Sequence, residues 1–569
     1  MSNNFAKNAY LKFMLWGILS SMGVTFCTLI DAMMIGHFIG SDGLAVTSLS
    51  NFVFLFLGLI AITLAVGANV LIGQNIGAYN YEKANDLFKK VLSVGLVISL
   101  IFTIISLIFK SPFLSLLGAS GKIKDLLGLY LLPVFFFTPI FILYNILVVS
   151  VRTDSDPGLA GIASVVLIIV NLCLDLIFMG VFDMGVLGAS LSMCIGEVCA
   201  FFVLLFHFKD KKHVLTFGFK KPDFKSIKDF IVNGFGVGSF YIFQALVVLF
   251  FNNLLLKNQD SGVTYVAIYG VIFTISQIPA GIFDGAGNAF GPVVSIFAGE
   301  NDYKSMNYVL KVALRYICII NIFVVLIFFF NAKEILAFFS ITNFIGDLVF
   351  KIYSISVLFT CINSLITSYW QCIGRPVFAS LMSLFRNLLL MLIIGYFLIR
   401  RTYIVGLVLT YLVVEFICSL VILAVYLKSP SKRFVEKKYS NNDLCFEKYY
   451  VIKKESMQDI SSDLDNVIET WDVDMKTAFK INFICEEILL NIIKFGLSDN
   501  KKECYIDIKL IKKNDESYVL RIRDNVNDYN PFDTDGDEID NGVIKLIKSK
   551  TKYYNYERKL IFNYLFMVI

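Results

Sequence analysis

The chain has 569 residues, of which 57% are hydrophobic and 17% charged, with a net charge of +5 at pH 7. A soluble protein carries about a quarter charged residues, so this polar surface cannot cover one large water-exposed globule. The positive charge is spread along the chain, whereas a nucleic-acid-binding protein would concentrate it on one stripe. The composition therefore predicts a membrane protein without a nucleic-acid partner.

The charged residues are divided unevenly along the chain. Residues 431–569 hold 48 of the 95 charged residues, while the much longer stretch 1–430 holds the other 47. Such a sharp change predicts a membrane domain followed by a water-soluble domain. The basic stretch 431–446 is expected to be a linker that lies against anionic lipid.

Residues 1–430 contain twelve apolar segments, each long enough for a membrane span of about 20 residues. They lie near 10–36, 44–73, 91–112, 125–150, 160–182, 185–208, 229–256, 264–298, 308–330, 346–370, 377–399 and 403–427. Long, continuously apolar runs form helices in lipid. The predicted fold is therefore an α-helical polytopic membrane protein with about twelve spans.

An internal repeat divides the spans into two groups of six. Residues 77–81 resemble residues 299–303 at an offset of 222, and the same offset aligns Asp31 with Asn253. The repeat predicts two six-helix lobes, 1–215 and 216–430. Two such lobes are typical of a transporter with its substrate path between them.

The basic loops predict the orientation of the spans. Loops 77–90 and 209–228 are rich in lysine and fall on the same side as Arg152, Lys304 and Arg375. Exceptions on the other side are Lys122, Lys124, Arg400 and Arg401. The balance predicts a multi-pass protein of the plasma membrane with both termini in the cytoplasm.

Polar residues within the spans indicate a binding site, because each costs free energy in hydrocarbon unless it is paired or hydrated. Asp31 lies in the first span, and Asn171 and Asp175 lie four residues apart on one face of the fifth. If Asp31 faces them, two close carboxylates cannot both ionise cheaply, so the site would bind a proton or Na⁺. The alternative is that Asp31 is a hydrated helix end near the membrane surface.

Three further acidic residues lie in other spans: Glu197, Asp284 and Glu415. They are candidates for contact with a cationic substrate. The alternative for each is an interfacial position or a paired acid.

Five groups of motif residues follow one another in the first 430 residues: Asp31 followed by Gly36 and Gly40, residues 67–69 and 74–77, residues 152–157, Asn171 through Asp175, and residues 185–189. Through these motifs, the first 430 residues resemble the MATE (multidrug and toxic compound extrusion) transporters. The resemblance implies an antiporter that expels cationic, amphipathic, drug-like molecules in exchange for H⁺ or Na⁺. It also implies that Asp31, Asn171 and Asp175 bind the coupling ion. Met193 stands where family members often have a hydroxyl in the sixth span, with Ser192 beside it.

Residues 447–569 are predicted to form a small α/β domain. Its expected elements are helices 456–471 and 475–496, strands 504–512 and 518–523, a helix over 542–550 and a final strand 558–569. The second helix contains Glu487 and Asn491, which lie four residues apart on one face.

This segment resembles the N-box of the GHKL ATPases, in the branch of the anti-sigma-factor kinases. The resemblance implies that Asn491 binds Mg²⁺ on ATP, that Glu487 acts as base or orients a nucleophile, and that Asp524 reads the adenine amino group. Gly542 would begin a helix near the phosphates, where free N–H groups stabilise anions. The chain departs from the family at Val526, where the family has glycine, and its Cβ could crowd a nucleotide. The domain could therefore bind ATP, act as a serine kinase, or regulate by binding a protein partner.

The leading hypothesis is a cation-coupled efflux antiporter with a cytoplasmic GHKL-like regulatory domain. One alternative is a lipid or polysaccharide flippase, although few cationic residues are present in the spans to bind phosphates. Another is a transporter-like ligand sensor that signals through the C-terminal domain. A primary ATP-driven pump is disfavoured because the chain has no Gly-x-x-x-x-Gly-Lys-[Ser/Thr] phosphate loop.

Overall fold

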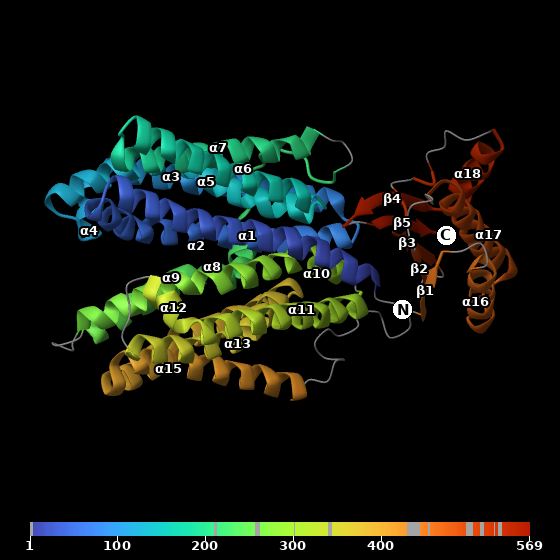
Figure 1. The fold of residues 1–569 in the computed structure, drawn as a ribbon. Helices are drawn as coiled ribbons and strands as arrows, with labels where there is room; N and C mark the ends of the chain where they lie inside the picture. The colour runs from blue at the N-terminus through green and yellow to red at the C-terminus, as the bar shows by residue number, and fades with distance from the viewer. Residues whose placement is uncertain are drawn as a thin grey trace. The chain divides into compact units, whose positions relative to one another are not determined.

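A computed structural model of the protein describes residues 4–209, 213–256, 262–300, 302–338, 344–428, 444–452, 456–496, 504–512, 517–527, 530–532, 538–560 and 562–569. The chain divides into two compact units, Tyr10–Val435 and Glu436–Ile569, the second of which includes Met1–Ala9. The larger unit is helical, and the smaller one combines helices with a β-sheet (Figure 1).

The larger unit contains two lobes that follow one another along the chain. The first lobe contains α1 (Asn4–Phe38), α2 (Ser41–Gly77), α3 (Tyr81–Ile108), α4 (Lys110–Leu116), α5 (Gly121–Thr153), α6 (Pro157–Asp175), the π-helical turn η1 (Leu176–Val181), α7 (Gly185–Leu205) and the short turn η2 (Phe206–Lys209). The second lobe contains α8 (Phe224–Leu255), α9 (Gly262–Asn288), α10 (Phe290–Gly299), α11 (Tyr303–Phe330), α12 (Ala332–Phe338), α13 (Phe344–Cys372), α14 (Pro376–Leu384), the π-helical turn η3 (Phe385–Leu389) and α15 (Leu390–Lys428).

Among the described residues, eleven helical segments are long and apolar enough to cross a membrane. The last of them, Pro376–Leu427, has 52 residues, and a straight helix of that length would extend about 78 Å, far more than a bilayer core. Its backbone leaves the helical conformation at Thr402 and Tyr403, where φ is −131° and 48°. The segment therefore makes two spans, and the prediction of twelve transmembrane helices is confirmed.

The prediction of a loop over residues 77–90 is wrong. Helix α3 begins at Tyr81, so Lys83, Lys89 and Lys90 lie in its first turns. The helix continues past its apolar part because Glu82 in the first turn interacts favourably with the helix dipole. Lys90 is also paired with Asp86 one turn earlier, at 2.7 Å.

The two lobes meet through glycines that let helix backbones approach closely. An ideal Cβ on Gly67 of α2 would lie 2.8 Å from the backbone nitrogen of Gly234 on α8. The Tyr10 hydroxyl at the start of α1 donates a hydrogen bond to the carbonyl of Ala286 on α9, at 3.1 Å. These contacts lie toward the end of the bundle where α1 begins and α2 ends, so the lobes are closed at that end.

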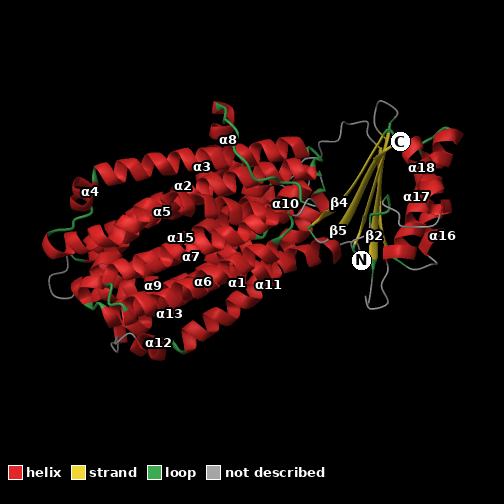
Figure 2. Ribbon diagram, turned by 90° about the horizontal axis from the view of Figure 1, so that it is seen from above, coloured by secondary structure: helices red, strands yellow, loops and turns green. Residues whose placement is uncertain are grey.

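The smaller unit is a five-stranded antiparallel sheet with helices on one face (Figure 2). Its strands are β1 (Leu444–Val451), β2 (Tyr505–Lys512), β3 (Tyr518–Asp524), β4 (Tyr553–Lys559) and β5 (Phe562–Val568), in the order β1-β2-β3-β5-β4. Its helices are α16 (Ser456–Thr470), α17 (Met475–Asn491) with the π-helical turn η4 (Ile492–Gly496), and α18 (Glu538–Lys550). Alternate strand residues such as Ile506 and Ile508 pack against Ile484 and Ile488 of α17 in a common core.

Three predictions for this domain need correction. Strand β1 begins at Leu444, inside the stretch expected to be a linker, and pairs with β2 over its whole length. The expected single strand 558–569 is instead part of the β4–β5 hairpin, which turns at Leu560. Helix α18 begins at Glu538, so Gly542 lies one turn inside it and its N–H is not among the four free groups at the helix start.

Candidate ion-binding site and the nucleotide-domain residues

Helices α1 and α6 bring the three predicted ion-site residues together within the first lobe. In the amide orientation that satisfies both of its ends, Asn171 donates to Asp31 Oδ1 and Oδ2, at 2.9 and 3.2 Å. The carboxyl groups of Asp31 and Asp175 interact electrostatically with each other. Asn171 and Asp175 are only 2% and 1% exposed, whereas Asp31 is half-buried. Asp31 therefore faces the fifth span, as the hypothesis of a polar site required.

A hydroxyl from the sixth span also reaches this site. Ser192 of α7 donates a hydrogen bond to Asp175 Oδ1, and the neighbouring backbone N–H of Met193 donates to Asn171 at 3.2 Å. Met193 therefore contributes its backbone, and the residue beside it supplies the side-chain oxygen. The second oxygen of Asp175, Oδ2, is buried and has no hydrogen-bond partner in the described part of the chain.

The backbone changes at the site as well. Asp175 is the last residue of α6, and the π-helical turn η1 follows immediately. A π turn widens the helix and displaces the hydrogen-bond ladder, and such turns are frequent at functional sites.

Sequence reasoning missed two residues at this site. Cys27, one turn before Asp31 on α1, has its Sγ 2.9 Å from the end of the Asn171 amide that faces Asp31. Tyr130 of α5 is 7% exposed and interacts electrostatically with Asp31. Neither residue carries a charge, so neither stands out in an apolar segment. Their signal was positional only: Cys27 lies four residues from Asp31 on the same helix face.

The other intramembrane acids occupy three different environments. Glu197 of α7 is 8% exposed and, among the described residues, has no hydrogen-bond or ion-pair partner. Asp284 of α9 is exposed, and it too has no such partner in the described part of the chain. Next to it, an ideal Cβ on Gly285 would lie 2.7 Å from the backbone carbonyl carbon of Gly17, so Asp284 lies at the contact between the lobes.

Glu415 is the paired acid that the sequence left open as an alternative. Its carboxylate accepts from Arg386 Nη2 at 2.8 Å and from Nε at 3.0 Å, and from Asn363 Nδ2 at 2.6 Å. Arg386 and Glu415 are 7% and 4% exposed. Sequence reasoning missed Arg386, although a lone arginine inside the span 377–399 was a sufficient signal.

In the smaller unit, helix α17 places Asn491 and Glu487 as predicted, on one face four residues apart. Asn491 is buried and Glu487 half-buried. Burial, with a contribution from Glu486, raises the pKa of Cys485 on the same helix to about 12, so this thiol is a packing residue. Asp524 ends β3, where its Oδ1 accepts from the backbone N–H of Val526 at 3.0 Å and from Asn563 at 2.8 Å.

Val526 occupies space beside the end of the N-box-like helix. It is 1% exposed, and its Cγ2 lies 2.5 Å from an ideal Cβ on Gly496, so it fills the space next to that glycine. The backbone is tied there too, since the N–H of Asn527 donates to the Gly496 carbonyl at 3.1 Å. Residues 533–537, which lead into α18, lie outside the described residues.

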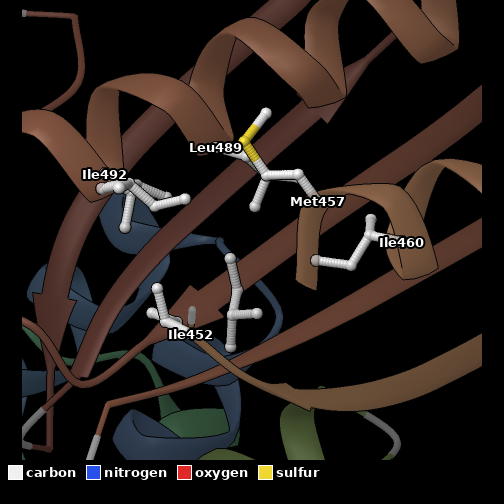
Figure 3. Close-up of a pocket in the computed structure, with 7 residues that line it drawn as sticks. Ile452, Met457, Ile460, Leu489 and Ile492 are labelled. Carbon is white, nitrogen blue, oxygen red and sulfur yellow. The ribbon is translucent and has the colours of Figure 1, made fainter. Parts of the chain in front are cut away.

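The C-terminal domain also contains a small hollow between α16, α17 and the sheet (Figure 3). Its volume is ≈ 10 Å³, about that of one water molecule. All seven lining side chains are apolar: Ile452, Met457, Ile460, Leu489, Ile492, Ile493 and Ile506. It is too small and too apolar for a nucleotide.

Comparisons with known proteins concern the membrane unit. Residues 17–177 match the MatE family model. The multidrug export protein MepA of Staphylococcus saprophyticus is 25% identical over 434 residues, covering 74% of this chain and 95% of that protein. MepA of Staphylococcus aureus gives the same identity and coverage.

Solved structures share the fold at lower identity. One is an outward-facing multidrug resistance MATE family transporter of the MOP superfamily, with a TM-score of 0.69, 19% identity, and coverage of 76% of this chain and 97% of that one. Another is a MOP superfamily transporter from Pyrococcus furiosus, with a TM-score of 0.67, 19% identity, and coverage of 75% and 97%.

Proposed function

We propose that this chain, a MATE-type multi-pass transporter by fold and sequence likeness, exports cationic, amphipathic small molecules in exchange for protons. The observation that carries the proposal is that Asn171 joins Asp31 of α1 to the buried end of α6, where Asp175 Oδ2 has no hydrogen-bond partner among the described residues. Two carboxyl groups in one poorly hydrated site cannot both ionise cheaply, so at least one of them is expected to hold a proton. The relatives named for multidrug export support drug-like substrates.

The site can act as a proton-dependent latch between α1 and α6. When the pair holds a proton, Asp31, Asn171 and Asp175 join the two helices. When the proton leaves, two negative charges face each other in a poorly hydrated site, and their repulsion favours separation of the helices.

Movement of α1 would reach the second lobe directly. The same helix carries Tyr10 and Gly17, which contact Ala286 and Gly285 of α9 at the closed end. A change at Asp31 therefore biases the lobe contact through one rigid element, which is what alternating access requires.

Asp284 is proposed as the anion that a cationic substrate contacts. It is exposed, has no partner in the described residues, and directly precedes Gly285 at the lobe contact. Glu415 is less suited to this role because Arg386 already neutralises it. Glu197 is buried and has no hydrogen-bond or ion-pair partner among the described residues, which favours a protonated carboxyl group over a substrate contact.

Protons are favoured over Na⁺ as the coupling ion. The amide orientation that satisfies both ends of Asn171 places its N–H toward Asp31 and suits a proton, whereas a bound Na⁺ would require the opposite orientation, with the amide oxygen there. An export assay in proteoliposomes tests Na⁺ when a Na⁺ gradient is imposed in place of the proton gradient.

We further propose that the basic loops and both termini lie in the cytoplasm, and that the α/β domain regulates the transporter there. The domain has its own hydrophobic core, formed by the sheet and its helices. Binding of a protein partner or of a nucleotide would be its regulatory input.

The test is export of a cationic dye from proteoliposomes with an imposed pH gradient. Asp31→Asn and Asp175→Asn are each expected to abolish proton-driven export while the protein keeps its wild-type melting behaviour. Asp125→Asn is the matched control, because Asp125 is exposed at the start of α5. Wild-type export by either site variant contradicts the proposal. Export driven by a Na⁺ gradient alone would identify Na⁺, and not the proton, as the coupling ion.

A further inference from the structure

Two of the three histidines of the chain lie together at one end of the first lobe. Asp154, His207 and His213 each offer one ligand atom, and these atoms lie within 4.8 Å of one another. The third histidine, His37, lies in the last turn of α1. We propose that Asp154, His207 and His213 bind a divalent transition-metal ion, with Zn²⁺ as the ion that fits best.

The donor set matches that ion. Zn²⁺ accepts imidazole and carboxylate ligands, and three protein ligands with a water in the fourth position form a common tetrahedral site. His207 Nε2 lies 3.0 Å from Asp154 Oδ2, and the rings of His207 and His213 are 3.7 Å apart between centroids. Tetrahedral ligand atoms are about 3.4 Å apart, so small side-chain rotations close the site. His213 is only half-buried and has room for such a rotation.

A second observation points independently to a metal. His207 turns its other ring nitrogen, Nδ1, toward Asp156 Oδ2 at 3.5 Å. A metal-binding histidine almost always donates this second N–H to a carboxylate or carbonyl, which fixes the ring and its tautomer. Asp154 is held in place as well, because it accepts from the backbone N–H groups of Val214 and Leu215, at 3.1 and 2.9 Å.

The alternative is a protonated His207 held between Asp154 and Asp156 without a metal. That arrangement does not require His213 to offer a ring nitrogen at the same point as Asp154 and His207, although it does so here. A metal ion uses both rings in their neutral form and supplies the positive charge itself. The presence of both rings beside the carboxylate therefore favours a metal.

The site connects three segments of the chain. Asp154 lies between α5 and α6, His207 lies in η2 after α7, and His213 begins the described part of the connection that leads to α8. That connection joins the first lobe to the second. A bound ion would fasten it to the first lobe and so restrict the movement of one lobe against the other.

The experiment is a Co²⁺ titration of the tag-free full-length protein in detergent, followed by displacement with Zn²⁺. Tetrahedral Co²⁺ absorbs in the visible range, and a Co²⁺–thiolate band would reveal binding to cysteine instead. Wild type and His37→Gln are expected to bind one equivalent with the same affinity. His207→Gln and His213→Gln should lose this binding, and Asp156→Asn should weaken it about 10–100-fold.

The melting temperature of each variant without metal controls for folding. If His207→Gln does not fold because His207 is buried, the result for His213→Gln alone decides whether the proposal stands. The proposal is overturned if the wild type gives no tetrahedral spectrum, if the thiolate band accounts for the binding, or if His213→Gln binds as tightly as the wild type.

Discussion

Gly77 and Gly299 occupy equivalent positions in the internal repeat and lie in contact with each other. An ideal Cβ on Gly77 would lie 3.0 Å from the Cα of Gly299. Gly77 ends α2 in the first lobe, and Gly299 ends α10 in the second. Equivalent residues can touch only near the axis that relates the two repeats, so this axis passes through the closed end of the bundle.

A side chain at this contact should separate the lobes. In Gly299→Ala, the new Cβ would meet the backbone nitrogen of Ala78 at 2.9 Å, which the backbone must move to accommodate. We expect the closed arrangement to lose about 1–3 kcal/mol of stability. Gly291→Ala is the matched control, because it lies on the same helix with open space around it.

The natural probe for this prediction is Cys372, which is 4% exposed and whose carbonyl accepts from Gln74 across the lobe contact, at 3.3 Å. A water-soluble maleimide should label it faster in Gly299→Ala than in wild type or Gly291→Ala. Mass spectrometry of the labelled peptides distinguishes Cys372 from the other cysteines. Equal labelling of all three proteins would show that the contact does not hold the lobes closed.

Asp284→Asn should weaken transport of cations specifically. If the exposed carboxylate contacts the substrate charge, its neutral isostere should raise the KM for a cationic dye about 5- to 10-fold, corresponding to roughly 1–1.4 kcal/mol. The KM for a neutral dye of similar size should stay unchanged. Equal effects on both dyes would point to a general defect, as would a lower melting temperature.

The Arg386–Glu415 pair should be structural. Removal of one partner, as in Arg386→Met, leaves the other charge buried and is expected to destabilise the protein by about 3–5 kcal/mol. The double change Arg386→Met with Glu415→Leu should recover most of that loss, since no charge is left unpaired. Thermal unfolding in detergent measures both, and a double variant as unstable as the single one would contradict this role.

The sequence was sufficient for the features that depend on composition and helical spacing. The apolar runs gave the twelve spans, and the four-residue spacing placed Asn171 and Asp175 on one face. The approach of Asp31 to that face depended on tertiary packing, so the residues alone left it as a hypothesis. Tyr130 and Cys27 could not be singled out, because an uncharged residue in a span carries no desolvation cost that would mark it.

In the small domain, strand pairing between distant residues could not be predicted from the sequence. Strand β1 pairs with β2, whose residues lie about 60 positions further along the chain, and no local pattern reports such pairing. The β4–β5 hairpin turns through Leu560, whose φ is 60°. Turns of this kind usually contain glycine or asparagine, so the leucine concealed the break between the two strands.

The last prediction tests whether the C-terminal domain binds a nucleotide at the proposed residues. Val526 stands where the GHKL family has glycine, and its side chain packs against Gly496 at the end of the N-box-like helix. If this side chain narrows the site, Val526→Gly should bind ATP–Mg²⁺ at least about fivefold more tightly than the wild type, a gain of roughly 1 kcal/mol. Asn491→Ala should remove ATP–Mg²⁺ binding both from the wild type and from Val526→Gly, because Asn491 is the proposed Mg²⁺ contact. Calorimetry on the full-length wild type and the three variants measures the binding. If ATP still binds after Asn491→Ala, any ATP site lies away from this helix. If even Val526→Gly does not bind ATP, a protein partner remains as the regulatory input.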